Sequence, residues 1–262
     1  MTFLIDKDFA LLYGIMLGDG CLSLIKGKKK FISITGSSEN DLPFFEKVIH
    51  PILFKLRGKK TNIKFRKGCK AIEFNFADKN LFDFIAFFGF PIGKKLDRLF
   101  IPEVFYEKKL VERVIAGFFA TDGSLVLTKN PNKYYPRLEA HVISISLLEE
   151  IFRYLSFLGM RGALYKCKRN TAPGEFNSRK RYRFQFNGKS NLILFQEKVG
   201  FVNPYYYSRF LNFIQYSDYY GEVLSNNEKR EFSQTYKKVN SDFDSKMTLG
   251  RLELPISACL KS

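Results

Sequence analysis

The sequence predicts an α+β fold made of two pseudo-symmetric αββαββα repeats. Each repeat has an antiparallel, saddle-shaped sheet, and the two motif helices are packed at the interface. Two stretches, residues 12–20 and 115–123, are near-copies, because each is an apolar run that ends in Asp-Gly. The elements expected after each stretch also follow one order, namely hairpin, helix, hairpin, helix. Such a duplication is typical of two similar halves related by a pseudo-twofold axis.

The two apolar stretches are expected to be buried helices, each stopped by the glycine at its end. Asp19 and Asp122 then lie at helix C-termini, where the partial negative charge of the helix end repels a carboxylate. Gly14 and Gly117 occupy equivalent places in the two copies, where two helices approach closely only if side chains are missing. The pattern predicts two helices side by side that bring two carboxylates together.

A divalent cation would remove the conflict between carboxylate and helix end. Asp19 and Asp122, with the nearby backbone carbonyls of Gly18 and Thr121, form a predicted oxygen site for Mg²⁺. The alternative is that each aspartate only forms an Asp-Gly turn, which is a common pairing without any metal. A matched pair in a duplicated, strongly basic chain favours the metal site.

Both stretches resemble the LAGLIDADG motif of homing endonucleases. The positions that match are the third, eighth and ninth, which are Gly14, Asp19 and Gly20 in one copy and Gly117, Asp122 and Gly123 in the other. The sixth position, often acidic in the family, is Leu17 and Ala120 here. The resemblance implies the single-chain form with two motifs, a monomer in which Asp19 and Asp122 are catalytic, Mg²⁺ is the cofactor and Mn²⁺ can replace it.

The charge of the chain indicates a polyanionic partner. The net charge is +17 and the pI about 9.6, which fits nucleic acid or an acidic membrane surface. The sequence contains no apolar stretch long enough for a bilayer and no secretory signal, so an intracellular protein, cytoplasmic or organellar, is expected. Four cysteines without CxxC spacing and only two histidines argue against a zinc site or a histidine-based nuclease.

The expected organisation is a first repeat over residues 1–90, a linker over 91–107, a second repeat over 108–220 and a poorly ordered basic tail over 221–262. Helices are expected at 8–18, 42–56 with a kink or break at Pro51, 79–88, 108–121, 147–158, 191–199 and 203–220. Strands are expected at 21–25, 31–35, 62–66, 71–76, 124–128, 140–145, 162–168 and 181–187.

Shorter matches support the repeat. Residues 32–35 resemble 143–146, and Asn80 with Leu81 resembles Asn191 with Leu192. These pairs are offset by 111 positions, whereas the motif aspartates are offset by 103 (122 minus 19). The difference of eight predicts one insertion, in the loop around residues 129–137.

The linker carries a further candidate catalytic residue. In the family a lysine that follows a Gly-Phe turn approaches the active site, and Lys95 is the closer match, with Lys94 next. An exposed linker lysine is an equally good interpretation of Lys95. The equivalent stretch of the second half, residues 204–209, has no lysine, so the resemblance implies two chemically unequal half-sites.

Basic residues recur at corresponding places in the two repeats, where they are expected to face double-stranded DNA. Most would grip phosphates, whereas outward side chains of twisted strands would read base edges in the major groove of a long asymmetric target. The candidates are Lys26, Lys28, Lys29, Lys30, Lys64, Arg66, Lys67, Lys70, Glu73, Asn75, Lys129, Lys133, Arg137, Lys166, Lys168, Arg169, Arg179, Lys180, Arg181, Arg183, Gln185 and Asn187.

The function expected from these features is metal-dependent hydrolysis of one phosphodiester in each DNA strand across the minor groove, which the resemblance implies leaves short 3′ overhangs. Lys95 would stabilise charge in the transition state. Two alternatives remain, an RNA-binding maturase that assists intron splicing and a DNA-binding regulator on the same scaffold. Both aspartates are present, which favours the endonuclease over either alternative, and the resemblance implies that it is encoded in an intron.

Overall fold

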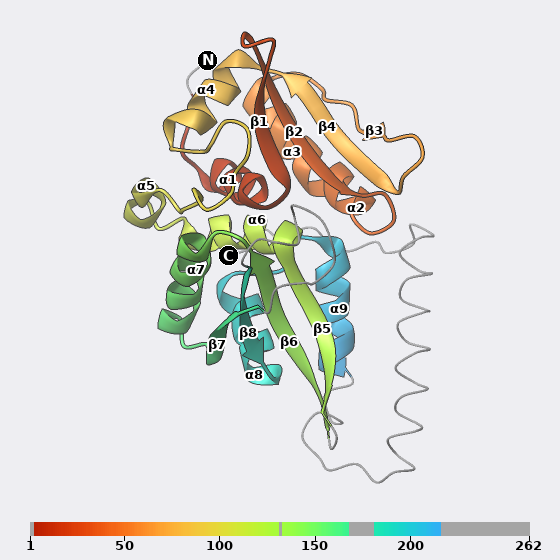
Figure 1. Ribbon diagram of the computed structural model, residues 1–262. Coiled ribbons are helices and arrows are strands. Elements are labelled where there is room, and N and C mark those ends of the chain that lie inside the picture. Colours follow the sequence, from red (N-terminus) through yellow and green to blue (C-terminus); the bar gives the residue numbers. More distant parts are fainter. Residues whose placement is uncertain (1–2, 131–132, 168–180, 216–262) are drawn as a thin grey trace.

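The protein folds into two similar halves, each built on a four-stranded antiparallel sheet. The computed structural model describes residues 3–130, 133–167 and 181–215. The strand orders are β1-β2-β4-β3 and β5-β6-β8-β7, so the two sheets have the same topology. Figure 1 shows the halves one above the other, with the motif helices α1 and α6 between the sheets. The α+β repeat predicted from the sequence is confirmed.

The first half contains α1 (Lys7–Asp19), β1 (Gly20–Ile25), β2 (Lys29–Ser37), α2 (Leu42–Phe44), the π-helical turn η1 (Phe45–Ile49), α3 (His50–Arg57), β3 (Lys64–Phe65), β4 (Ala71–Ala77) and α4 (Lys79–Phe87). After the connecting helix α5 (Glu103–Glu107), the second half contains α6 (Val111–Asp122), β5 (Gly123–Asn130), β6 (Lys133–Val142), α7 (Ile145–Phe157), β7 (Gly162–Lys166), β8 (Tyr182–Asn187), α8 (Lys189–Lys198) and α9 (Pro204–Gln215).

The two motif helices cross at their glycines. A Cβ added to Gly14 would overlap the carbonyl oxygen of Val114, and a Cβ added to Gly117 would overlap that of Leu11. Residues 9–18 of α1 are all buried, because α6 covers one side of the helix and the first half covers the other. The close approach predicted from the duplicated glycines is therefore present, and it fixes the ends of both helices relative to each other.

The glycines that end the motif helices are required because a side chain at either position would overlap its own helix. Gly20 and Gly123 are both extended, with φ of −83° and −75°, so neither needs the left-handed conformation usual for a helix-ending glycine. A Cβ on Gly20 would overlap Met16, and a Cβ on Gly123 would overlap Phe119. The chain consequently turns straight from each motif helix into the first strand of a sheet.

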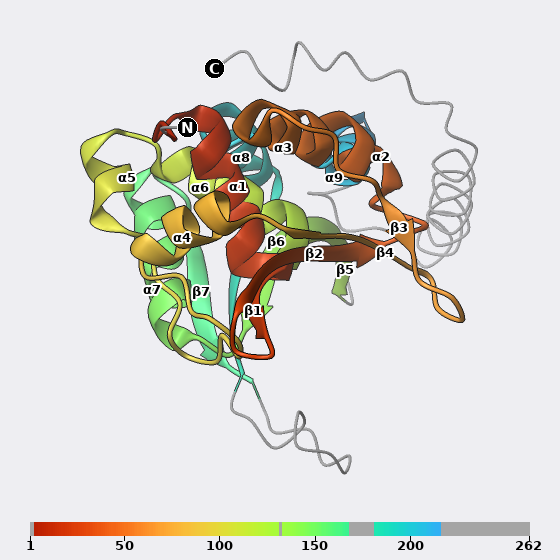
Figure 2. The same cartoon turned by 90° about the horizontal axis from the view of Figure 1, so that it is seen from above.

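One face of each sheet packs against helices, as the alternation of the strands requires. In the first sheet Leu22, Ile32 and Phe74 are buried against α1 to α4, and Figure 2 shows α1, α2 and α3 on one side of this sheet. In the second sheet Leu138 and Phe186 are buried in the same way. The opposite faces carry the polar and basic side chains of the alternate positions. Within the described ranges, no helix has the length and apolar character needed to cross a bilayer.

The helix expected over residues 42–56 is continuous, but it contains a π-helical turn. Proline cannot donate the hydrogen bond of a helix interior. Here the helix widens over Phe45–Ile49, and the amide of His50 bonds the carbonyl five residues earlier, on Phe45. Pro51 then lies in the first turn of α3, where its missing amide is tolerated. The predicted break at Pro51 is thus a local widening just before it.

The second motif helix begins at Val111, three residues later than predicted. Residues 103–107 form the separate helix α5, and Lys109 has a left-handed φ of 54° that interrupts the helical path. In the second half β6 runs from Lys133 to Val142, so it covers part of the segment that was predicted to be a loop.

The match between residues 32–35 and 143–146 is wrong. Residues 32–35 lie inside β2, whereas 143–146 connect β6 to α7 and begin that helix. The strand residue opposite the motif glycine is Ile34 in the first half and Ala140 in the second. The offset at this point is 106 (140 minus 34), and not 111.

The eight extra residues of the second half therefore result from insertions and deletions at several places, and not from one insertion. The left-handed glycine after the central helix is Gly58 in one half and Gly159 in the other, an offset of only 101 (159 minus 58). The buried phenylalanines Phe74 and Phe184 restore the offset to 110 (184 minus 74). A shorter central helix is thus compensated by a longer connection before β8.

Candidate active site

The carboxylates of Asp19 and Asp122 lie at the adjacent C-terminal ends of α1 and α6. The side chain of Thr121 lies against Gly18, so the last turns of the two helices are in contact. Burial, together with the nearby charges of Asp122 and Asp41, raises the pKa of Asp19 to about 7. Burial also raises the pKa of Asp122, an effect opposed by the charge of Lys95. Burial thus disfavours the charged form of both carboxyl groups, and the charge of Asp122 disfavours it further in Asp19.

Lys95 reaches from the linker to the end of α1. Its ammonium group donates to the carbonyl oxygens of Met16 at 3.3 Å and Leu17 at 3.0 Å, and it also bonds the carbonyl of Gly18. These are carbonyls of the last turn, which carry the negative end of the helix dipole. Burial lowers the pKa of Lys95, whereas Asp122 and Asp19 oppose this shift. The lysine is therefore a buried cation beside both aspartates.

The end of α6 is held by different groups. The amide nitrogen of Asn203 donates to the carbonyl oxygen of Ala120 at 3.0 Å, and the hydroxyl of Tyr206 donates to that of Gly123 at 2.6 Å. The same Asn203 nitrogen donates to Asp41 Oδ1 at 3.0 Å. The two helix ends are thus chemically unequal, with a lysine at one and an asparagine and a tyrosine at the other.

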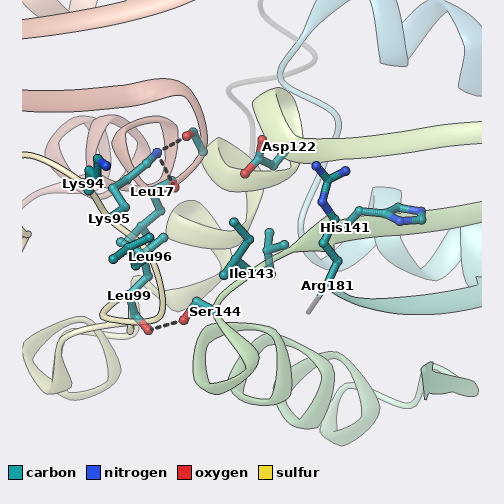
Figure 3. A pocket seen from close by; sticks show the side chains of 12 residues that line it. Leu17, Lys94, Lys95, Leu96, Leu99, Asp122, His141, Ile143, Ser144 and Arg181 are labelled. Atoms are coloured by element: carbon teal, nitrogen blue, oxygen red, sulfur yellow. Dashed lines mark hydrogen bonds between the residues drawn. The ribbon is translucent and has the colours of Figure 1, made fainter. Parts of the chain in front are cut away.

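A cavity of about 630 Å³ opens beside Asp122 and the end of α1. Figure 3 shows Asp122 in its lining between Lys95 on one side and the side chains of Arg181 and His141 on the other. Arg181 immediately precedes β8 and His141 lies on β6, so both come from the second sheet. The cavity therefore combines a carboxylate with cationic side chains, an arrangement suited to a phosphate group.

The donor set fits a hard divalent cation. Two buried carboxylates whose pKa values are raised by burial, and in Asp19 also by mutual repulsion, favour a bound cation. The described residues contain no cluster of three or more His, Cys, Asp or Glu side chains that could hold a metal, so other ligands must be carbonyls, water or phosphate oxygens. The Gly18 carbonyl already accepts from Lys95, whereas the Thr121 hydroxyl donates within its own helix to Phe118.

The first sheet presents five of the predicted DNA-binding residues on its open face. The register pairs Lys64 with Glu73 and places Arg66 opposite Ala71, so Lys64, Arg66, Glu73 and Asn75 share one face. Arg66 donates to Glu73 at 2.8 Å. Lys29 belongs to this face as well, since it alternates with the buried Ile32 and Ile34. Lys26 and Lys28 are exposed in the tight turn before β2, and Lys67 and Lys70 are exposed in the turn before β4.

The open face of the second sheet carries Arg137, Arg183 and Asn187. Arg137 donates to Asn187 at 2.9 Å and lies 3.7 Å from Glu139, and Arg183 lies over the ring of Tyr165. These bonds keep long side chains extended along the sheet surface. Arg181, just before β8, lines the cavity that also contains Asp122.

Three of the predicted DNA-binding residues do not fit that role. Lys30 lies on the helix side of β2, where it pairs with Asp83 of α4, because the strand alternation turns it toward the core. Lys166 pairs in register with Tyr182, so it leaves β7 on the helix side and not on the open face, although its side chain is exposed at the end of this edge strand. Gln185 is on the open face but only 5% exposed, since it donates to Glu139 and its neighbours cover it.

Six further candidates cannot be placed. Lys168, Arg169, Arg179 and Lys180 lie outside the described residues, as do the side chains of Lys129 and Lys133 and the tail predicted over 221–262. Their DNA contacts remain predictions.

Asp41, Asn203 and Tyr206 were not predicted as parts of the site. Asp41 occupies the N-cap position of α2, but its side chain makes no capping bond there. Its carboxylate instead accepts from the Ser37 amide at 2.8 Å and from Asn203. A buried asparagine just after a Gly-Phe pair, at the place equivalent to the linker lysine segment, is the signal that could have drawn notice to Asn203.

Comparison with known proteins finds the same fold in solved structures only. No protein-family model and no curated protein matches the chain. I-SmaMI, solved bound to its uncleaved DNA target in the presence of calcium ions, matches with a TM-score of 0.57 at 13% identity, over 93% of this chain and 99% of I-SmaMI. The homing endonuclease I-DmoI matches at 18% identity with a TM-score of 0.47, over 74% of this chain and 88% of that one.

The I-SmaMI match covers 93% of this chain, so it spans both halves and the two motif helices. This chain therefore has the fold of the single-chain, two-motif LAGLIDADG homing endonucleases.

Proposed function

We propose that this protein is a site-specific endonuclease for double-stranded DNA. It hydrolyses one phosphodiester in each strand across the minor groove and leaves short 3′ overhangs. The observation that carries the proposal is the pair of buried carboxylates, Asp19 and Asp122, at adjoining helix ends between two sheets with basic open faces. Each carboxylate serves one strand, because the two helices are related by the pseudo-twofold axis of the fold.

The sheets bind the DNA. Arg and Lys side chains on the open faces grip phosphates, and this term gives affinity and salt dependence without sequence information. Asn75, Asn187 and Arg183 are placed to read base edges in the major groove. I-SmaMI, which shares the fold, was solved bound to its uncleaved DNA target, and this supports DNA as the partner.

Asp19 and Asp122 would hold Mg²⁺, with Mn²⁺ as a substitute. When bound, such an ion supplies a water of lowered pKa and compensates charge on the phosphate. The chain's own residues orient the reacting groups. Asp19 and Asp122 are fixed by the two packed helices, Lys95 lies beside both carboxylates as a cation, and Arg181 lines the same cavity as a second cation for the phosphate.

The test is cleavage of a large randomised double-stranded library with Mg²⁺ and, separately, with EDTA, followed by sequencing of the new ends. We expect metal-dependent double-strand cuts at one long site with short 3′ overhangs. Binding without any cut in Mg²⁺ or Mn²⁺ would overturn the proposal. A gel-shift assay with structured intron RNA would then test the splicing-factor alternative.

A further inference from the structure

Different side chains bond the carbonyls at the C-terminal ends of the two motif helices. At the end of α1, one ammonium group bonds three successive carbonyls. At the end of α6, the carbonyl of Ala120 accepts from the neutral amide of Asn203. Ala120 is two residues before Asp122 and belongs to the last turn of α6. Whatever fixes this carbonyl also fixes the direction in which the Asp122 carboxylate leaves the helix.

The side chain of Asn203 is fixed by hydrogen bonds at both of its polar atoms. It is only 1% exposed, and each of its polar atoms has a partner. The amide nitrogen donates to Ala120 and to Asp41 Oδ1, both at 3.0 Å, and the amide oxygen accepts from the backbone nitrogen of Tyr205 at 3.0 Å. An asparagine with this many bonds has one orientation, because any rotation breaks at least two of them.

Asp41 ties Asn203 to the first half of the molecule. Its second oxygen, Oδ2, accepts from the backbone nitrogen of Ser37, the last residue of β2, at 2.8 Å. Burial raises the pKa of this carboxyl, whereas the bonds from Ser37 and Asn203 stabilise its charged form. The chain of contacts runs from the end of β2 through Asp41 and Asn203 to Ala120, so it joins the halves at the side of the site away from Lys95.

We propose that Asp41 and Asn203 are a positioning pair for Asp122. The inference rests on the proposed endonuclease function. The pair holds the last turn of α6 against the first half. Without the pair, the Asp122 carboxylate leaves its productive orientation. Asp19 keeps its orientation, because Lys95 still bonds the carbonyls of the last turn of α1. Because each strand depends on its own aspartate, the loss affects one strand more than the other.

The experiment follows strand-resolved cleavage of a supercoiled plasmid that carries the target, under single-turnover conditions with Mg²⁺. The proteins are the wild type, Asn203→Ala, Asp41→Ala and the double variant. We expect each single variant to cut one strand at least tenfold more slowly, so that nicked plasmid accumulates. The slow strand should be the same in both, and the double variant should be no slower than the worse single one. DNA affinity should change less than threefold.

A matched control is Asn191→Ala. Asn191 is also a buried asparagine that bridges backbone groups, with bonds to Arg161 and Asn187, but it lies on α8 away from the aspartates. It should lower the Tm without favouring one strand. The exchange Asp41→Asn with Asn203→Asp retains an amide to carboxylate bond between positions 41 and 203 but leaves no donor for Ala120. This exchange variant should therefore fold and, like the single variants, cut one strand slowly, so that nicked plasmid accumulates. The test thus stays valid even if Asn203→Ala does not fold.

Equal slowing of both strands in the variants, or no slowing, would overturn the inference while leaving the endonuclease in place. A wild-type protein that cuts neither strand overturns the proposed function and the inference with it.

Discussion

At the scale of single residues, the ionised carboxylate of Asp19 beside Asp122 lowers the free energy of unfolding of the metal-free protein. The pKa of Asp19 rises from an unfolded value near 4 to about 7 in the folded state. A group whose folded pKa is raised contributes stability that is present below its unfolded pKa and is lost as the pH rises through the folded pKa. The loss therefore falls between about pH 4 and 7, and three pK units correspond to about 4 kcal/mol.

The first prediction isolates this effect by comparing the wild type with Asp19→Asn in EDTA. The two should be about equally stable at pH 4, whereas the variant should be more stable by a few kcal/mol at pH 8. Urea unfolding at both pH values measures the difference. A stability difference that does not change with pH would show that Asp19 is not forced to be charged beside Asp122. Added Mg²⁺ should raise the stability of the wild type at pH 8 more than that of the variant.

The second prediction concerns the buried lysine. Lys95→Met removes the donor to three carbonyls and the cation beside both aspartates, so cleavage should fall about a hundredfold with little change in DNA affinity. Lys94→Met is the matched control, because Lys94 lines the same cavity but is exposed and, in Figure 3, lies on the far side of Lys95 from Asp122. Single-turnover rates measure both. Equal effects of the two substitutions would contradict the role of Lys95.

The sequence predicts the role of a single residue where that residue belongs to a recognisable local motif. Asp19, Asp122 and Lys95 belong to local motifs with fixed spacing, and the structure brings all three together. Asp41 and Asn203 are 162 positions apart and meet only through the packing of α2 and α9. No local pattern encodes such a contact, so the sequence could not reveal it.

At the scale of elements, strand alternation decides which basic residues meet DNA. Lys29 and Lys30 are neighbours on β2 but face opposite sides, with Lys29 near Phe31 on the open face and Lys30 paired with Asp83 on the helix side. A list of basic residues in the sequence cannot make this distinction unless the register is known.

The third prediction uses this pair. Lys29→Ala should weaken DNA binding and reduce the slope of log affinity against log salt by about 1. Lys30→Ala should leave both unchanged and cost a few tenths of a kcal/mol in stability, because its ion pair is partly exposed. Fluorescence anisotropy at several salt concentrations measures the slopes. A reduced slope for Lys30→Ala would contradict the register of β2.

Element types and order were largely predictable, because hydrophobic periodicity and Gly-rich turns are local. Boundaries were less so. The π-helical turn before Pro51, the break at Lys109 and the extended β6 depend on how the chain packs. The duplicated segments also misled the alignment of the halves, since Ile-Ser-Ile occurs once in a strand and once before a helix.

At the scale of the whole molecule, the two sheets have the same topology but different surfaces. Glu73 on the first sheet corresponds to Arg183 on the second, as their places in register show, so one position carries opposite charges. Thr35 corresponds in the same way to His141. The two halves cannot contact identical sequences with such different side chains.

The fourth prediction follows from this difference. The target should be long and without twofold symmetry, because each half-site is read by its own set of side chains. Sequences recovered from the cleaved library test this. A palindromic target would contradict the assignment of the open faces to base readout, since it requires both halves to read alike.

The central claim is that Asp19 and Asp122 together carry the hydrolysis, and one measurement tests it most directly. On the recovered target with Mg²⁺, the wild type, Asp19→Asn and Asp122→Asn are compared for cleavage of each strand and for DNA affinity. The account predicts that all three bind with similar affinity and that neither variant makes a double-strand break. Full cleavage by either variant would contradict it.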